Sequence, residues 1–353
     1  MGLIRAAAAA ILLALPVQAA PPVPAGDSLR IATYAPDLSR DGPGLLLRDL
    51  GRDDPQVLAA VQVIVAAAPD VIVLTGFDWD HDGLALAGFA DLLADHGHAM
   101  PHRFAGPPNT GVPTGLDMDG DGRSGHPRDA QGFGRFRGED GMAVLSRLPI
   151  GPVTDHSAVR WRDLPGNLMP ADTPPEVAAI QRLSTTAHWD VQVTTRAGPL
   201  HLLSWSATPP VFGPDGGDRN ARRNHDEAVF WLNHLPDAPF VLIGNANLDP
   251  NDGNGRREAI RALIAATQDP APRGTWQPPQ TDPHDAPQTG DPALDTAFWP
   301  DRAPGNLRVD YVLPSPGMTV TASGVIWPDP DTSLGAAAQA ASAHRLVWVD
   351  LVP

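Results

Sequence analysis

Short apolar runs with strand character follow one another along most of this chain, and the segments between them are helices or loops in no regular order. The run at residues 71–74, Val-Ile-Val-Leu, is continuous, as expected for a strand buried on both faces. Other such runs lie at residues 29–34, 142–148, 185–195, 200–204, 240–244, 307–313, 319–325 and 345–351. Strands outnumber helices and the two types alternate irregularly. This pattern predicts an α/β fold of the α+β type, a sandwich of mixed β-sheets flanked by outer helices.

Helix signals are clearest near residue 54. Asp54 and Pro55 are residue types that favour an N-cap and a first helical position, and Val57, Val61 and Ile64 continue at helical spacing. Further helices are predicted at residues 83–95, 218–235 and 256–266. The Pro- and Gly-rich stretches 101–140 and 268–306 are predicted to be long loops, which at such lengths are usually functional or disordered.

The first 20 residues have the pattern of a secretory signal. Arg5 precedes an apolar run at residues 6–15 that is too short to span a bilayer, and residues 17–19 fit a small-residue cleavage site. No later stretch approaches the roughly 18 apolar residues of a membrane span. Residues 21–353 contain no internal repeat and no linker between two cores, so we expect one domain, exported to the periplasm or the cell exterior.

Composition excludes several kinds of chemistry. The chain has no cysteine, which rules out disulfides, thiolate nucleophiles and Cys-type zinc sites, so an exported protein must be held by its hydrophobic core. Every basic residue is Arg, which excludes Schiff-base chemistry on lysine. The net charge of -16 disfavours binding to long nucleic acid, whereas a local Arg patch can still bind one phosphate group. The sequence does not indicate a protein partner.

Three segments place polar residues at the ends of predicted strands. Asn245 and Asn247 follow the apolar run 240–244, Asp310 lies within the run 307–313, and His344 precedes the run 345–351. In their order and spacing the segments resemble the active-site strands of the endonuclease/exonuclease/phosphatase superfamily, the fold of DNase I-like nucleases, inositol-polyphosphate phosphatases and sphingomyelinases. The resemblance covers roughly residues 29–351 and implies a four-layer α/β sandwich.

The resemblance assigns roles to the retained residues. In this family a divalent metal polarises the phosphate, and a His–Asp pair works with an Asp that activates water. His344 matches the family's His, Asp310 matches the Asp that orients it, and Asn247 matches an amide that contacts phosphate. A carboxylate beside an imidazole fixes the tautomer of the imidazole and raises its pKa. These three residues are the candidate catalytic set.

Five positions with family roles carry other residues. Asn245 replaces the Asp that acts as a base, and an amide cannot take a proton from water. Ala35, Gly76 and Ala343 stand where the resemblance expects metal ligands, and Ser206 stands where it expects a second His. The resemblance therefore implies an enzyme fold whose metal-dependent phosphoester hydrolysis is lost or strongly reduced. It also implies that the cleft where the family has its active site still binds a phosphorylated ligand or a partner.

An alternative is an active phosphodiesterase, phosphatase or nuclease with a displaced metal site. Asp37 and Asp78 lie two residues beyond the vacant positions at 35 and 76, and a period of two in extended chain points side chains to the same side. Such a site would hold Mg²⁺ or Mn²⁺ together with Asp310 and His344. The other interpretation is that Asp37 and Asp78 are ordinary solvated loop acids.

Two further motifs carry charge. Arg222 and Arg223 lie at the start of the predicted helix before Asn245, a position that suits phosphate binding or, equally, a surface ion pair. Asp117, Asp119 and Asp121 match the opening of a calcium loop, although position twelve is Arg instead of Glu, so the loop is not an EF-hand. This motif favours a Ca²⁺ site over a solvated acidic loop and raises a third hypothesis, a calcium-stabilised binding module without catalysis.

Overall fold

Two β-sheets form the centre of the protein. The computed structural model describes residues 20–278, 288–300 and 305–353, so the predicted signal segment 1–20 lies almost wholly outside the described residues. The six-stranded sheet has the order β12-β13-β1-β2-β4-β3, and the five-stranded sheet has the order β11-β8-β7-β6-β5. The strands of the first are β1 (Leu29–Tyr34), β2 (Val71–Phe77), β3 (His102–Phe104), β4 (Gly141–Ser146), β12 (Thr319–Val325) and β13 (Val347–Val352). Those of the second are β5 (Ile150–Asp155), β6 (His188–Thr195), β7 (Gly198–Ser206), β8 (Phe240–Asn245) and β11 (Asp310–Pro314).

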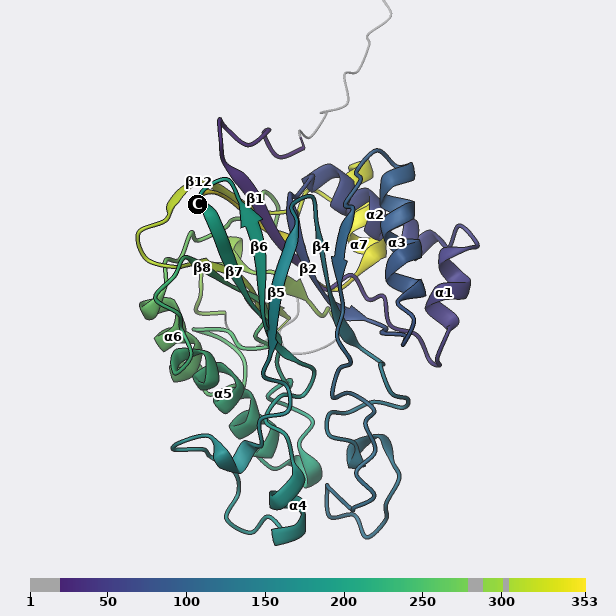
Figure 1. Ribbon diagram of the computed structural model, residues 1–353, viewed down its shortest axis with the longest axis vertical. Coiled ribbons are helices and arrows are strands. Elements are labelled where there is room, and N and C mark those ends of the chain that lie inside the picture. The colour runs from purple at the N-terminus through teal and green to yellow at the C-terminus, as the bar shows by residue number, and fades with distance from the viewer. Residues whose placement is uncertain (1–19, 279–287, 301–304) are drawn as a thin grey trace, which may run out of the picture.

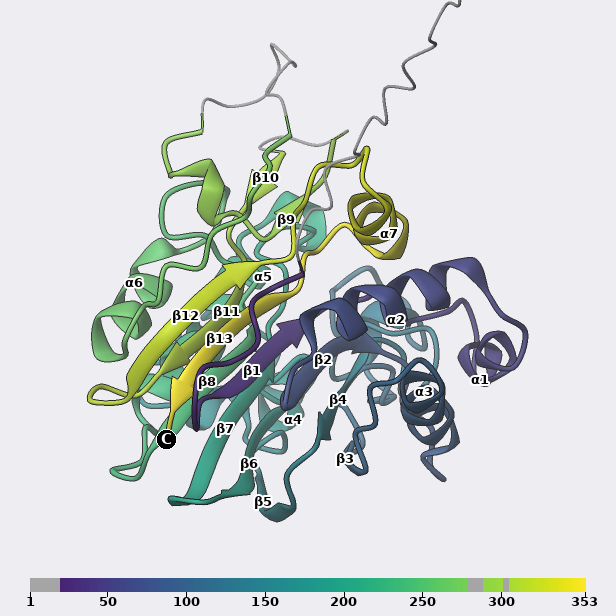
Figure 2. The same cartoon turned by 90° about the horizontal axis from the view of Figure 1, so that it is seen from above.

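Helices cover the outer faces of both sheets, which gives four layers. One outer layer contains α1 (Leu45–Leu50), α2 (Pro55–Ala67), α3 (Leu84–Asp95) and α7 (Ser333–Ala341), and the other contains α5 (Arg219–Leu232) and α6 (Arg257–Ala266). Figure 2 shows the two groups of helices on opposite sides of the paired sheets. The short α4 (Pro175–Ile180) and the small hairpin of β9 (Ala297–Phe298) and β10 (Asn306–Leu307) complete the described elements. The predicted fold class is confirmed.

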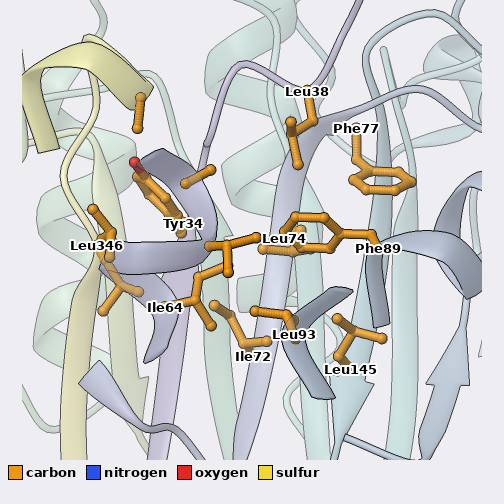
Figure 3. Close-up of a cluster of buried hydrophobic side chains, with 14 of the residues drawn as sticks. Tyr34, Leu38, Ile64, Ile72, Leu74, Phe77, Phe89, Leu93, Leu145 and Leu346 are labelled. Carbon is orange, nitrogen blue, oxygen red and sulfur yellow. The ribbon is translucent and has the colours of Figure 1, made fainter. Parts of the chain in front are cut away.

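Three apolar clusters hold the four layers together. Val73, Val144 and Ile243 belong to the cluster between the two sheets, where strands from both contribute. A second cluster lies between the six-stranded sheet and its helices, and its aromatic members Phe77 and Phe89 have ring centroids 5.8 Å apart (Figure 3). A third lies under α5 and α6. Strands such as β2 are apolar on both faces because each sheet is covered on both sides.

Several boundaries differ from the sequence prediction. The predicted strand at 307–313 is divided into β10 and β11, because the N–H of Arg308 donates to the Asp249 carboxylate at 2.7 Å and that of Val309 donates to Thr296 Oγ1 at 3.0 Å. These two N–H groups therefore form no hydrogen bonds to a neighbouring strand. The sequence analysis missed α7, whose Ala-rich sequence has no apolar periodicity but whose Thr332 side chain caps its N-terminus. It also missed α1, α4, β5 and the short strands β3 and β9.

The sheet topology collects strand ends at one end of the sandwich. β1 runs parallel to β2. β13 is antiparallel to β1, and β4 is antiparallel to β2. The C-termini of β1 and β2 therefore lie at the same end of the sheet as the N-termini of β4 and β13. In the other sheet, β7 runs parallel to β8, and β11 runs antiparallel to β8. The long segment before β4 and the segment that carries α4 extend beyond the sheets at one end of the molecule (Figure 1). Among the described residues, no helix has the length and apolar character needed to cross a membrane.

Candidate functional site

A cavity of about 350 Å³ opens among these strand ends. Its floor is formed by the residues that end β1, β2, β7 and β8 or precede β4, β11 and β13. The sequence-predicted positions Asp37, Asn247, Ser206 and His344 all line it. The described lining residues are Ala35, Asp37, Thr75, Gly76, Asp140, Thr185, Thr186, Ser206, Ala207, Pro209, Pro210, Val211, Phe212, Asn245, Asn247, Gly253, Asn254, Trp299, Leu307, Val309 and His344. Segments far apart in sequence thus meet in one cleft.

His344 and Asp310 form a hydrogen-bonded pair at this cleft. The Nδ1 atom of His344 lies 2.8 Å from Oδ2 of Asp310, and Thr296 Oγ1 donates to the same oxygen at 3.0 Å. The side chains of His344 and Asp310 are 11% and 1% exposed. Burial alone would lower the pKa of His344, but the charge of Asp310 and its hydrogen bond outweigh burial and raise that pKa above its usual value. The pair therefore favours the protonated form of the imidazole.

The loop before His344 is fixed by the first strand. Ser342 Oγ donates to the backbone oxygen of Ala35 at 2.6 Å and accepts the N–H of His344 at 2.9 Å. The ring of Trp299 lies edge-on to the His344 imidazole, with centroids 5.4 Å apart. The imidazole is therefore positioned by Asp310, by Trp299 and by the backbone of its own loop, and it faces the cavity.

The two asparagines after β8 are also held in place. Asn245 Oδ1 accepts the backbone N–H of Asn247 at 2.7 Å, and Asn247 Nδ2 donates to the carbonyl of Ala207 at 2.8 Å. Asn247 adopts a left-handed backbone with φ 49°, a conformation that Asn tolerates better than most residues. The sequence prediction that Asn247, Asp310 and His344 meet at one cleft agrees with this geometry.

The positions that the family resemblance assigns to metal ligands carry no oxygen-bearing side chain. Ala35 and Gly76 line the cavity at the ends of β1 and β2, and Ala343 directly precedes His344. A hard divalent ion needs oxygen ligands, and methyl groups or hydrogen atoms supply none. The family arrangement of metal ligands is therefore not fitted by the residues at these positions. Ser206, where the resemblance expects a second His, lines the same cavity with a hydroxyl.

The two acids proposed for a displaced metal site are placed differently. Asp37 is exposed and lines the cavity. Asp78 is 6% exposed, and its carboxylate accepts hydrogen bonds from Ser39 Oγ at 2.7 Å, Arg40 N at 2.8 Å and Asp140 N at 3.1 Å. Its oxygens tie the loop after β1 to the start of β4, and they do not line the cavity. Asp78 therefore stabilises loops, which is a correction to its proposed place in a metal site.

Asp140 lines the cavity and was missed by the sequence analysis. It directly precedes β4 and has a left-handed backbone with φ 52°. The Asp140 side chain is solvent-accessible but lies inside the concave cleft, where desolvation by the surrounding protein and the negative charges of Asp37, Asp78 and Glu139 raise its pKa to about 7. No spacing rule identified this residue, because its place in the cleft depends on the pairing of β4 with β2.

Among the described lining residues there is no Arg, so His344 is the one side chain that can carry positive charge there.

The Arg pair on α5 does not reach this cleft. Arg223 is 8% exposed and donates to the backbone carbonyls of Gln131, Arg182, Leu183 and Ser184. Its guanidinium is thus occupied by loop carbonyls instead of being available to phosphate. Arg222 pairs with Asp218 on the surface at 2.7 Å, which is the ion-pair alternative of the sequence analysis.

Side chains of the same helix, α5, hydrogen-bond to the loops that border the cleft. Glu227 is fully buried and accepts the backbone N–H groups of Thr185 at 2.6 Å and Thr208 at 2.7 Å. Burial raises the pKa of Glu227 to about 7. Asn224 donates to the carbonyls of Thr208 and Ala246, both at 2.8 Å. Polar side chains of α5 therefore fix the loops that carry Thr185, Ser206 and Asn245 to the cavity.

The acids of the predicted calcium loop are not among the residues that line the cleft. Asp117, Asp119 and Asp129 have carboxylate oxygens within 4.8 Å of one another, and they are the one group of three acids or imidazoles this close in the described part of the chain. Asp129 takes the place that the sequence analysis gave to Asp121, which instead lies 3.8 Å from the His126 ring. Asp117 accepts the N–H groups of Gly120 and Gly122, as in a tight loop around an ion or an Asx turn.

Comparisons with known proteins bear on the family and the fold of this chain. The sequence model of the Endonuclease/Exonuclease/phosphatase family matches residues 41–344. An endonuclease/exonuclease/phosphatase structure from Beutenbergia cavernae is similar over 92% of this chain and 72% of its own, with a TM-score of 0.56 and 22% identity. A family protein from Leptotrichia buccalis is similar over 92% of this chain and 100% of its own, with a TM-score of 0.51 and 13% identity. Among curated proteins no relative matches.

The chain therefore belongs to the Endonuclease/Exonuclease/phosphatase family, because the family's sequence model covers most of its length. The structural similarities, at these identities, show the shared fold.

Proposed function

We propose that this protein is an exported family member whose metal-dependent phosphoester hydrolysis is lost or strongly reduced, and whose cleft binds a small phosphorylated ligand. The observation that carries the proposal is Asn245. Its amide stands at the base position and its oxygen already accepts the N–H of Asn247, so it has no means of taking a proton from water. The residues at positions 35, 76 and 343 add no metal ligand.

The retained groups suit binding. The charge and hydrogen bond of Asp310 favour a protonated His344 imidazole, and Ser206 lines the same cavity with a hydroxyl. Pro209, Pro210 and Trp299 form an apolar side of the same cavity. A cleft of about 350 Å³ is within the usual range for small ligands. The ligand class that fits is a phosphoester with an apolar or aromatic substituent, and the acidic net charge of -16 disfavours long nucleic acid.

An assay with bis(4-nitrophenyl) phosphate tests the loss of hydrolysis. We expect no magnesium- or manganese-dependent turnover by the purified protein above the rate of a His344→Ala variant. The same comparison on DNA covers nuclease activity. Turnover that requires the metal and disappears in His344→Ala would contradict the proposal and support the alternative of an active phosphodiesterase. Inorganic phosphate should raise the melting temperature of the wild type but not of His344→Ala, since a ligand of the folded state stabilises it.

We also propose that calcium binds the loop of Asp117, Asp119 and Asp129, supported by the closeness of their carboxylates. Calcium should raise the melting temperature, by about 2.7 kcal/mol of stability at a concentration one hundred times Kd. An Asp119→Ala variant should melt at the same temperature in calcium and in chelator. If the wild type also shows no difference between calcium and chelator, the loop holds no ion.

A further inference from the structure

Two imidazoles meet at the C-terminal end of α5. His156 directly follows β5, and His234 lies just past the last residue of α5. Their ring centroids are 5.8 Å apart, and neither histidine lines the cleft. An imidazole nitrogen lies about 2.0–2.1 Å from a bound zinc ion, so the ring centres of two ligands of one ion are roughly 5–6 Å apart. The two rings are therefore spaced as two ligands of a single ion would be.

The His234 ring is held so that one nitrogen keeps a free lone pair. Its Nδ1 atom lies 2.7 Å from the backbone oxygen of Phe230. A carbonyl oxygen only accepts hydrogen bonds, so Nδ1 carries the hydrogen and Nε2 carries the lone pair. The ring also stacks on Phe230, with centroids 4.0 Å apart and an interplanar angle of 17°. Histidines that bind metals almost always have their other nitrogen hydrogen-bonded in this way.

The His156 ring is kept in the neutral form. It is half-buried, and its centroid lies 5.3 Å from that of Phe230. Burial lowers the pKa of His156, and the nearby His234 lowers it further. No residue that the structure describes hydrogen-bonds to either ring nitrogen of His156. A neutral imidazole without such a bond has a lone pair available to a metal ion, whereas a protonated one does not.

The surroundings of the pair favour a positive charge. Asp155 and Asp190 lie close enough to oppose the lowering of the His156 pKa. Asp190 is on β6, and its carboxylate accepts the Nδ1–H of His201 at 2.8 Å. The C-terminal end of a helix such as α5 also carries a partial negative charge from its peptide dipoles. A cation between the two imidazoles would therefore be attracted by the carboxylates and by the helix end.

We propose that His156 and His234 bind a transition-metal ion of the Zn²⁺ type at the C-terminal end of α5. Imidazole ligands suit zinc, copper and nickel, whereas carboxylates suit magnesium and calcium. Water would fill the other positions of a four-coordinate ion. The ion would join the end of β5 to α5, the helix whose Asn224 and Glu227 fix loops at the cleft. This site does not depend on the proposed function.

Calorimetric titration of the full protein with ZnCl₂ alone, in buffer without calcium or phosphate, tests the pair. We expect binding that His156→Ala and His234→Ala each weaken by at least about tenfold, because losing even an outer-shell partner of a metal ligand costs about 10–100-fold in affinity. The matched control is His96→Ala at the end of α3. The Nδ1 atom of His96 lies 2.8 Å from the backbone oxygen of Leu92, the same local arrangement as in His234. His96→Ala should leave zinc binding unchanged.

The NMR signals of the histidine rings locate the ion. Those of His156 and His234 should shift together as zinc is added, while those of His96 stay in place. Circular dichroism checks the fold of each variant, and His234→Ala keeps the test decisive if the half-buried His156 cannot be replaced. The proposal is overturned by absence of zinc binding, by binding that His234→Ala does not weaken, or by equal weakening in His96→Ala. Zinc-dependent shifts of the His344 ring alone would place the ion in the cleft and would also overturn it.

Discussion

The cleft contains two polar groups that are built in opposite ways. On one side, Asp310 is buried and its Oδ2 atom accepts hydrogen bonds from Thr296 and His344. On the other side, Asp37 and Asp140 are exposed, have left-handed backbone and accept no hydrogen bond from the described residues. We call the first the dyad group and the second the acidic pair. The dyad group is buried and hydrogen-bonded within the fold. The acidic pair lies on loops, where the negative charges of the two carboxylates repel each other.

This difference indicates that the dyad group contributes mainly to the stability of the fold and the acidic pair mainly to ligand binding. A buried carboxylate with partners is costly to disturb because the partners stay behind without it. Exposed carboxylates that repel each other lower the stability of the free protein, and such groups persist where binding uses them. The comparison predicts that changes in the dyad group destabilise the fold and that changes in the acidic pair stabilise it.

The largest effect is expected for Asp310→Ala. This change leaves the His344 imidazole and the Thr296 hydroxyl without their acceptor, and breaking a buried pair costs about 3–5 kcal/mol. Urea denaturation of the variant should show this loss. The matched control is Asp140→Ala in the acidic pair, which should lose no stability. Equal losses in the two variants would mean that the two groups are not built differently.

An intermediate effect is expected from the pH dependence of the dyad group. The folded pKa of His344 is raised above that of the unfolded chain, because the attraction of Asp310 outweighs burial. The protonated imidazole therefore stabilises the fold fully below the unfolded pKa of 6.5, and this contribution is lost as the pH rises through the folded pKa.

The measurement is the difference in unfolding free energy between the wild type and His344→Ala, followed upward from about pH 6. The difference should shrink as the pH rises, and it should stay smaller than the effect of Asp310→Ala. An NMR titration of the His344 ring gives the folded pKa directly. A folded pKa at or below 6.5 would show that Asp310 does not stabilise the imidazolium.

The smallest effect is expected for Asp140→Asn in chelator. Because the folded pKa of Asp140 is about 7 and its usual value is 3.8, the charged carboxylate destabilises the fold progressively as the pH rises from about 4 to about 7. The side chain is exposed, so solvent screening limits the gain to less than about 1 kcal/mol. Asp140→Asn should therefore be slightly more stable than the wild type at pH 8 and equal to it near pH 4. A variant that is less stable at pH 8 would place Asp140 with the dyad group.

The site could be predicted where a residue lies on a strand whose identity the sequence makes clear. Asn247, Asp310 and His344 follow or begin such strands, and their meeting place was predicted from the order of the motifs. Asp78 and Arg223 were assigned wrong roles, because their hydrogen bonds to loops distant in sequence decide where their polar atoms point. Asp140 was missed because nothing beside it in sequence distinguishes it from the many other acids in the long loop.

The sequence by itself determined the layered fold, since the apolar runs of strands such as β2 require cover on both faces and the chain has the helices to supply it. It also determined which groups the cleft lacks, because the residue type at each motif position is read directly. Only the tertiary structure decided which side chains share the cavity. The pairing of β4 with β2 brings Asp140 to Gly76, and the packing of α5 turns Arg223 away from the cleft toward loop carbonyls. These contacts join residues distant in sequence, and local propensity carries no information about them.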